Sequence, residues 1–173
     1  MLDGKLLFLG MRNLARLLFL LILLNTLASC GLFRKVHQTS TSSGKEQKWV
    51  QEALAYLGKP YCNGGQDTKC FDCSGLVWRA CKSAGCEVPR TCEALYAFGK
   101  PLQRNAVKPG DLVFFNTSAK GGKKANHVGI VTHTGENLRF VHASSSKGVM
   151  ENTLAETYYR NALLGFMRLP CAE

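Results

Sequence analysis

The sequence predicts an α+β domain in which helices come first and a mostly antiparallel β-sheet follows. Two observations support this fold class. Apolar residues recur at helical spacing up to about residue 98, whereas short runs rich in Val, Ile and Phe alternate with turn residues from residue 111 onward. Helices and strands that are segregated along a chain are typical of α+β proteins. Setting aside the first 29 residues leaves about 144, enough for one domain with a sizeable core.

The first 29 residues have the features of a secretory signal peptide. Basic residues precede an apolar run over Leu17–Leu24, and Leu27–Ser29 brings small residues directly before Cys30. The apolar run is too short to span a bilayer comfortably, which disfavours a retained transmembrane helix. The Leu-Ala-Ser-Cys pattern resembles the lipobox of bacterial lipoproteins, which implies cleavage before Cys30 and lipid on its thiol; ordinary secretion is the alternative. The start is Met1 or Met11, the second of which opens the more typical signal.

Residues 30–44 are polar and rich in Ser and Thr, and we interpret them as a tether between the lipid and a domain at 45–173. The first 29 residues hold three basic and one acidic side chain, so 19 Lys and Arg remain against 11 Asp and Glu. This balance favours acidic partners such as anionic lipid, nucleic acid or an acidic cell-wall polymer. Export makes nucleic acid the least favoured of these. A basic surface that serves only solubility is the alternative.

Three helices are predicted before the sheet. The first begins at a capping-box pattern, Ser43-x-x-Glu46, and its apolar stripe continues to Leu57. The second follows Asp72, a residue typical of helix N-caps, and runs to the next glycine. The third is short and spans about 91–98.

Four strands are predicted after these helices. They are expected at residues 111–115, 127–133, 138–143 and 163–169. A tight turn around Gly135–Glu136 joins the second and third strands and sets a register in which His127 faces Ser144. His142 then lies one diagonal away on the same face, at roughly 7–8 Å between backbones.

Cys70 and Cys73 stand three positions apart at the predicted start of the second helix. A redox pair normally follows a strand in a βαβ unit, whereas a glycine-rich loop precedes these two. A zinc site would also need Cys81 and Cys86, but Cys81 lies in the middle of an apolar helical stripe and a second C-x-x-C is absent. We therefore expect neither a metal nor another cofactor.

Cys73 is better explained as a nucleophile. A thiol in the first turn of a helix faces unpaired N–H groups and the positive end of the helix dipole, which favour the reactive thiolate. The same N–H groups can stabilise the oxyanion of an attacked carbonyl. One of the two imidazoles, His127 or His142, could then act as the base while the other orients it, as in a cysteine triad. His37 and His133 are more typical of surface histidines, and two histidines on one sheet face are by themselves more often structural.

Four motifs resemble, in order, those of the NlpC-type cell-wall cysteine peptidases: FDCSGLV, PGDLVFF, NHVGIV and FVHASSS. The resemblance covers about Lys45 to Leu169. It implies a papain-like core with N-terminal helices packed on the sheet. It also implies hydrolysis of the γ-D-glutamyl bond to a diamino acid in peptidoglycan stem peptides.

The resemblance also assigns roles to individual residues. They are Cys73 as nucleophile, His127 as base, His142 as orienting residue, Tyr61 at the oxyanion site, and Asp72 and Ser74 in the stem-peptide pocket. The chain departs from the family pattern at Asn63, where an aromatic residue is common. This departure affects the wall of the substrate pocket.

The leading hypothesis is a peptidoglycan endopeptidase that acts as a monomer in the cell envelope and is held to a membrane by its lipid, facing the periplasm or the wall. One alternative is a catalytically silent lipoprotein that binds wall fragments or a partner protein. Another is an acyltransferase or amidase that uses the same three residues. The intact nucleophile and histidine positions disfavour the silent protein.

Six cysteines remain besides the lipidated one and the nucleophile, and they allow fifteen pairings. Cys81 is expected to be a buried free thiol. We expect a disulfide between Cys62 and Cys70, which flank the glycine-rich loop; a Cys70–Cys73 bridge is the alternative. The sequence assigns no partner to the other three, Cys86, Cys92 and Cys171.

Overall fold

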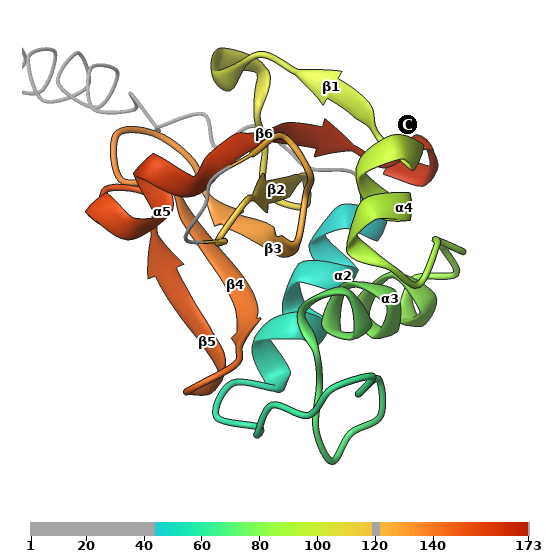
Figure 1. Ribbon diagram of the computed structural model, residues 1–173. Coiled ribbons are helices and arrows are strands. Elements are labelled where there is room, and N and C mark those ends of the chain that lie inside the picture. Colours follow the sequence, from blue (N-terminus) through green and yellow to red (C-terminus); the bar gives the residue numbers. More distant parts are fainter. Residues whose placement is uncertain (1–43, 119–121, 173) are drawn as a thin grey trace, which may run out of the picture. The chain divides into compact units, whose positions relative to one another are not determined.

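The computed structural model describes residues 44–118 and 122–172, which form four α-helices and a six-stranded sheet (Figure 1). The predicted α+β class with an antiparallel sheet is confirmed. The described residues exclude the predicted signal peptide and the predicted tether up to residue 43, and with them Cys30, His37 and Ser43. Gly44, the last residue of the predicted tether, begins the first described helix. No helix within the described ranges is long and apolar enough to cross a membrane.

The three predicted helices are present. α2 spans Gly44–Ala55, α3 spans Cys73–Ser83 and α4 spans Cys92–Phe98. The N-cap prediction for α3 is confirmed, because the Asp72 side chain accepts a hydrogen bond from a backbone N–H in the first turn. The apolar stripe of α2 was predicted too long. The helix ends before Leu57, whose side chain is 49% exposed.

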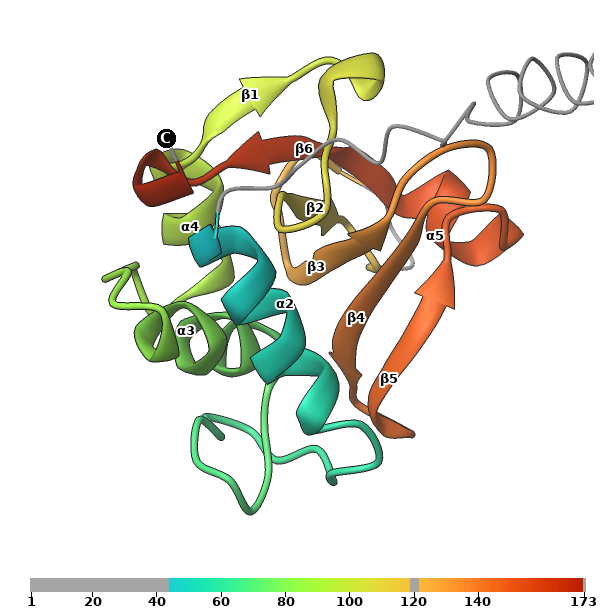
Figure 2. The same cartoon turned by 180° about the vertical axis from the view of Figure 1, so that it is seen from behind.

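The sheet contains six antiparallel strands in the order β1-β6-β2-β3-β4-β5. Their bounds are Lys100–Leu102 (β1), Leu112–Phe115 (β2), His127–His133 (β3), Arg139–Ser144 (β4), Gly148–Thr153 (β5) and Leu163–Arg168 (β6). Both Figure 1 and Figure 2 show α2, α3 and α4 on the opposite side of the sheet from α5, which spans Thr157–Ala162.

The sequence did not predict the two edge strands or α5, and each omission has a physical reason. β1 is three residues long and contains a proline, and β5 has the mixed polar sequence GVMENT. An edge strand needs no continuous apolar pattern because part of it faces water. α5 and the two short 3-10 helices, Arg104–Ala106 and Pro170–Ala172, are too brief to show a helical period.

The predicted register between the second and third strands is confirmed where β3 and β4 pair. Ile130 pairs with Val141 and Val131 with Phe140, and the register shifts only at His133. His127 and His142 therefore lie on one face of the sheet. That face carries the second of two hydrophobic clusters, in which Phe115, Phe140 and Tyr159 pack together. The first cluster lies between the helices and the other face.

Candidate active site

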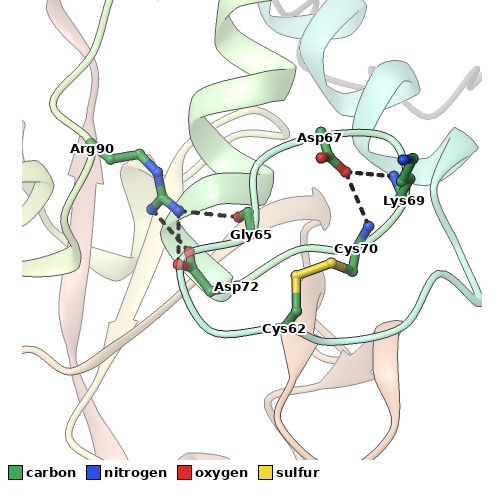
Figure 3. The surroundings of a disulfide bond; sticks show 7 residues. All are labelled: Cys62, Gly65, Asp67, Lys69, Cys70, Asp72 and Arg90. Carbon is green, nitrogen blue, oxygen red and sulfur yellow. Dashed lines mark hydrogen bonds and ion pairs between the residues drawn. A yellow bond between two sulfur atoms is a disulfide. The ribbon is translucent and has the colours of Figure 1, made fainter.

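The loop that leads into α3 is closed by a disulfide between Cys62 and Cys70, as predicted (Figure 3). Because Cys70 is bonded to Cys62, the redox pair with Cys73 is excluded. A second disulfide joins Cys86 to Cys171. The zinc hypothesis is wrong as well, because two of its four cysteines are in disulfides and Cys81 is buried inside α3.

This closed loop packs directly on the first turn of α3. The carbonyl oxygen of Gly65 accepts a hydrogen bond of 3.0 Å from the Asp72 backbone N–H. Gly75 is needed for this approach, because a Cβ atom at that position would overlap the Gly65 carbonyl group. The loop and the helix start therefore form one rigid unit beside Cys73.

Arg90, which sequence reasoning missed, ties this unit together (Figure 3). Its guanidinium donates to both carboxylate oxygens of Asp72 at 3.0 and 2.8 Å, to the Ser74 hydroxyl at 3.0 Å and to the Gly65 carbonyl at 3.1 Å. Burial opposes ionisation of Asp72, but these bonds and the Gly75 N–H outweigh it and keep the pKa of Asp72 below its ordinary value. Asp72 and Ser74, predicted to line a pocket, are thus already engaged within the protein.

The Cys73 thiol is strongly acidified. Its pKa falls from 9.0 to about 5, chiefly because the Cys92 side chain hydrogen-bonds to it. Burial opposes the shift, whereas a hydrogen bond and positive charge from His127 and the backbone N–H of Val128 add to it. Cys73 is therefore largely a thiolate at neutral pH.

Cys92 is the second residue of this site that sequence reasoning missed. It is the first residue of α4, whose N-cap is Thr91, and it carries a free thiol. The bond to Cys73 raises the pKa of Cys92, with burial and the Cys73 charge acting in the same direction. Cys92 thus remains a protonated donor to the neighbouring thiolate. Cys81, by contrast, is a buried free thiol as predicted, and burial raises its pKa to about 12.

His127 and His142 contact each other on the sheet. His127 Nε2 lies 2.8 Å from His142 Nδ1, and the two rings meet edge to face. His142 is 1% exposed, and burial together with His127 lowers its pKa to about 4. The nitrogen of His127 left for Cys73 is therefore Nδ1, since Nε2 is taken.

Two further residues hold His142 from the other side. Asn152 Oδ1 lies 2.8 Å from His142 Nε2, and the Tyr159 hydroxyl lies 3.2 Å from the same nitrogen. Asn152 comes from β5 and Tyr159 from α5. Because the sequence predicted neither element, it gave no reason to place these side chains here.

Tyr61, predicted to lie at the oxyanion site, is close to Cys73 and Asp72. It forms an isolated parallel bridge with Phe71, directly before Asp72. Burial raises the pKa of Tyr61, and the negative charges of Cys73 and Asp72 raise it further. The structure thus brings Tyr61, Asp72 and Cys73 within electrostatic reach of one another.

A cavity of about 320 Å³ opens on the side of the histidines. Its lining includes His127 and His142. Polar residues of the β4–β5 hairpin and of the segment around α5 line it as well, among them Ser144, Lys147, Asn152, Glu156 and Tyr158. A ligand in this cavity would therefore lie against the imidazoles rather than against the disulfide-closed loop.

The fold and the sequence together identify the class of protein. Residues 58–168 match the NlpC/P60 family, and the chain belongs to that family. Among solved structures, a protein from Staphylococcus aureus described as similar to lipoprotein, NLP/P60 family, matches with a TM-score of 0.64 and 32% identity over 78% of this chain and 44% of its own. The predicted family resemblance is confirmed.

Individual relatives carry more specific names. A gamma-DL-glutamyl hydrolase of Bacillus subtilis is 39% identical over 121 residues, which are 69% of this chain and 28% of that protein. The murein DD-endopeptidase MepH of Escherichia coli is 30% identical over 147 residues, which are 82% of this chain and 52% of that protein. This chain thus spans about half or less of these relatives' lengths.

Proposed function

We propose that this protein is a cysteine endopeptidase that cleaves the stem peptides of peptidoglycan. One observation carries the proposal: the thiol of Cys73, with a pKa of about 5, hydrogen-bonds to His127, which in turn contacts the buried His142. An acidified thiol beside an oriented imidazole is the arrangement that cysteine nucleophiles require. Membership of the NlpC/P60 family and the endopeptidase names of its relatives support the same function.

In the proposed reaction, the Cys73 thiolate attacks the carbonyl carbon of the scissile amide. Backbone N–H groups at the start of α3 and the Tyr61 hydroxyl stabilise the charge that develops on the oxygen. As the C–N bond breaks, His127 gives its Nδ1 proton to the leaving amine, and a thioester remains on Cys73. The same nitrogen then takes a proton from water, whose oxygen attacks the thioester carbonyl; the C–S bond breaks, which releases the carboxylic acid and returns Cys73 to the thiolate.

We infer that the bond cleaved is the γ-D-glutamyl bond to a diamino acid. The relative named a gamma-DL-glutamyl hydrolase supports this choice, whereas the relative named a DD-endopeptidase represents the alternative bond. The acyl half of the substrate would lie along Tyr61 and the loop braced by Arg90. The leaving amine would occupy the cavity beside His127, where Lys147 and Glu156 offer charges of both signs to a diamino acid.

Incubation of the purified domain with defined muropeptides tests the proposal. Mass spectrometry should detect the γ-D-glutamyl product and the free diamino-acid fragment with the wild type and neither with Cys73→Ala. A product cut at a DD bond would correct the bond assignment. Transfer of the acyl group to an added amine without hydrolysis would favour an acyltransferase, and binding without any product would favour the silent protein.

We further propose that Cys30 carries a lipid and that residues 30–44 tether a monomeric domain, residues 45–173, to an envelope membrane. The lipobox-like sequence before Cys30 supports this anchor. Cys30→Ser should leave an unprocessed or mislocalised precursor, to be followed by mass and by membrane fractionation. Normal processing and normal recovery in the membrane fraction would contradict the anchor without affecting the proposed chemistry.

A further inference from the structure

A line of hydrogen bonds continues beyond the two histidines to the edge of the sheet. Asn152 Nδ2 donates to the two carboxylate oxygens of Glu156 at 2.8 and 3.0 Å, and Asn152 Oδ1 faces His142 Nε2 at 2.8 Å. His142 Nδ1 faces His127 Nε2, also at 2.8 Å. Four side chains from β3, β4, β5 and the residue before α5 are thus connected in series.

Glu156, at the outer end of this series, determines which group donates and which accepts in every bond. The bond from Asn152 is the main cause that lowers the pKa of Glu156, with burial opposing and the Thr153 backbone N–H helping, so Glu156 is an anion. An ionised carboxylate can only accept hydrogen bonds. Asn152 must therefore turn its NH₂ group toward Glu156 and its oxygen toward His142.

The same logic fixes the protons of both rings. The amide oxygen of Asn152 can only accept, so His142 carries its proton on Nε2. Because His142 is neutral at physiological pH, its Nδ1 has no proton and must accept. His127 therefore carries a proton on Nε2, and the proton that it can exchange is the one on Nδ1, toward Cys73.

We propose that Asn152 and Glu156 are positioning residues that hold both imidazoles in the tautomers needed for proton transfer at Cys73. The kinetic part of this inference rests on the proposed peptidase function. The tautomers themselves can be measured without a substrate, so the two proposals can fail separately.

The Tyr159 hydroxyl is a second hydrogen-bond partner for His142 Nε2. It is 3.2 Å from His142 Nε2, and burial raises the pKa of Tyr159 to about 12, so it stays a donor. If Asn152 loses its acceptor oxygen, Tyr159 can donate to Nε2 and drive the His142 proton to Nδ1. Protons on His142 Nδ1 and on His127 Nε2 would then point at each other across the same contact.

Three charged or titratable groups face His142. They are His127 from β3, Tyr159 from α5 and Glu156, the residue before α5.

The test is nitrogen-15 NMR of histidine-labelled protein in a Cys73→Ala background, above neutral pH. We expect His142 and His127 both to carry their protons on Nε2. Asn152→Leu should move the His142 proton to Nδ1, and adding Tyr159→Phe should weaken that preference. A proton on His142 Nδ1 in the parent protein, or tautomers unchanged by Asn152→Leu, would overturn the proposal.

Kinetics in the Cys73-containing protein provide the matched readout. Asn152→Leu should lower kcat by roughly 10- to 100-fold with little change in KM, whereas Asn161→Leu, at an exposed position of α5, should not. Asn152→Asp keeps an acceptor but sets two carboxylates together, so Asn152→Asp with Glu156→Gln should regain activity over Asn152→Asp alone. Equal loss in these two variants, with thermal unfolding unchanged, would contradict the proposed orientation of the pair.

Discussion

The two halves of the site are held in different ways. On the thiol side, a loop closed by the Cys62–Cys70 disulfide lies on α3, and Arg90 clamps both through charged hydrogen bonds. On the imidazole side, strand pairing holds His127 and His142, and a series of neutral and charged hydrogen bonds runs from the buried His142 outward to the exposed Glu156. The thiol side therefore depends on covalent bonds and charge, whereas the imidazole side depends on burial and on the direction of its bonds.

The largest expected effect comes from removing the groups that join the two halves. Cys73→Ala and His127→Ala should each lower kcat/KM by at least about 1,000-fold, and the double variant should lose little more because the residues act as a unit. His142→Ala should be milder, since water can partly replace an orienting group. Muropeptide hydrolysis measures all of these, with His133→Ala as the control. Substantial activity in Cys73→Ala would remove the mechanism.

The two disulfides should separate stability from activity. The Cys86–Cys171 bridge spans 85 positions and Cys62–Cys70 spans 8, so chain entropy predicts a larger loss of unfolding free energy for the first, about 4–5 against about 2–3 kcal/mol. Of the two variants in which both cysteines of a bridge are replaced by Ala, we expect only the Cys62–Cys70 variant to lose activity specifically, because that bridge lies beside Tyr61. Urea unfolding and hydrolysis rates at a temperature where both variants are folded would measure this. The reverse assignment would contradict the role of the closed loop.

Replacing Arg90 tests the charged hydrogen bonds that hold Asp72 and the disulfide-closed loop together. Arg90→Leu should lower the free energy of unfolding by about 1–3 kcal/mol at neutral pH, since it leaves a partly buried carboxylate without its partner. The pKa of Asp72 is depressed in the folded state, so this contribution is present above its ordinary value of 3.8 and is lost as the pH falls through the folded pKa. The difference between wild type and variant should therefore shrink in acid. Arg90→Lys keeps the charge without the fork and should fall between the two.

The smallest expected effect is a shift in pH dependence at Cys92. Cys92→Ala removes the main cause that lowers the pKa of Cys73, so the thiolate should form at a higher pH than in the wild type, where the pKa is about 5. Cys92→Ser keeps a donor and should shift it less. The rate of Cys73 alkylation against pH, followed by peptide mass spectrometry, measures this. Identical profiles for Cys92→Ala and wild type would show that the helix start and His127 suffice.

Local chemistry in the sequence was enough to predict one residue set on each side of the site. Asp72 is an N-cap before an apolar stripe, which placed Cys73 at a helix start, and the hairpin register brought His127 and His142 together. The short loop between Cys62 and Cys70 made their bridge plausible.

The missed residues have no comparable local pattern. Arg90 lies in the irregular link between α3 and α4, and Cys92 directly follows this link. No hydrophobic periodicity in this segment indicates the partners of either residue. Asn152 sits on an edge strand whose polar sequence does not predict a strand. The Cys86–Cys171 bridge joins chain segments that only the complete fold brings together.

That second bridge also changes what a cut in the chain would do. The covalent ring from Cys86 to Cys171 encloses every strand of the sheet, and with it both histidines and Asn152, while Cys73 lies outside the ring on the segment before it. A protease that cleaves once between β2 and β3 would therefore release no fragment. The two pieces would migrate as one species without reductant and separate when it is added. After a single nick there, the imidazole half would remain covalently attached to the thiol half.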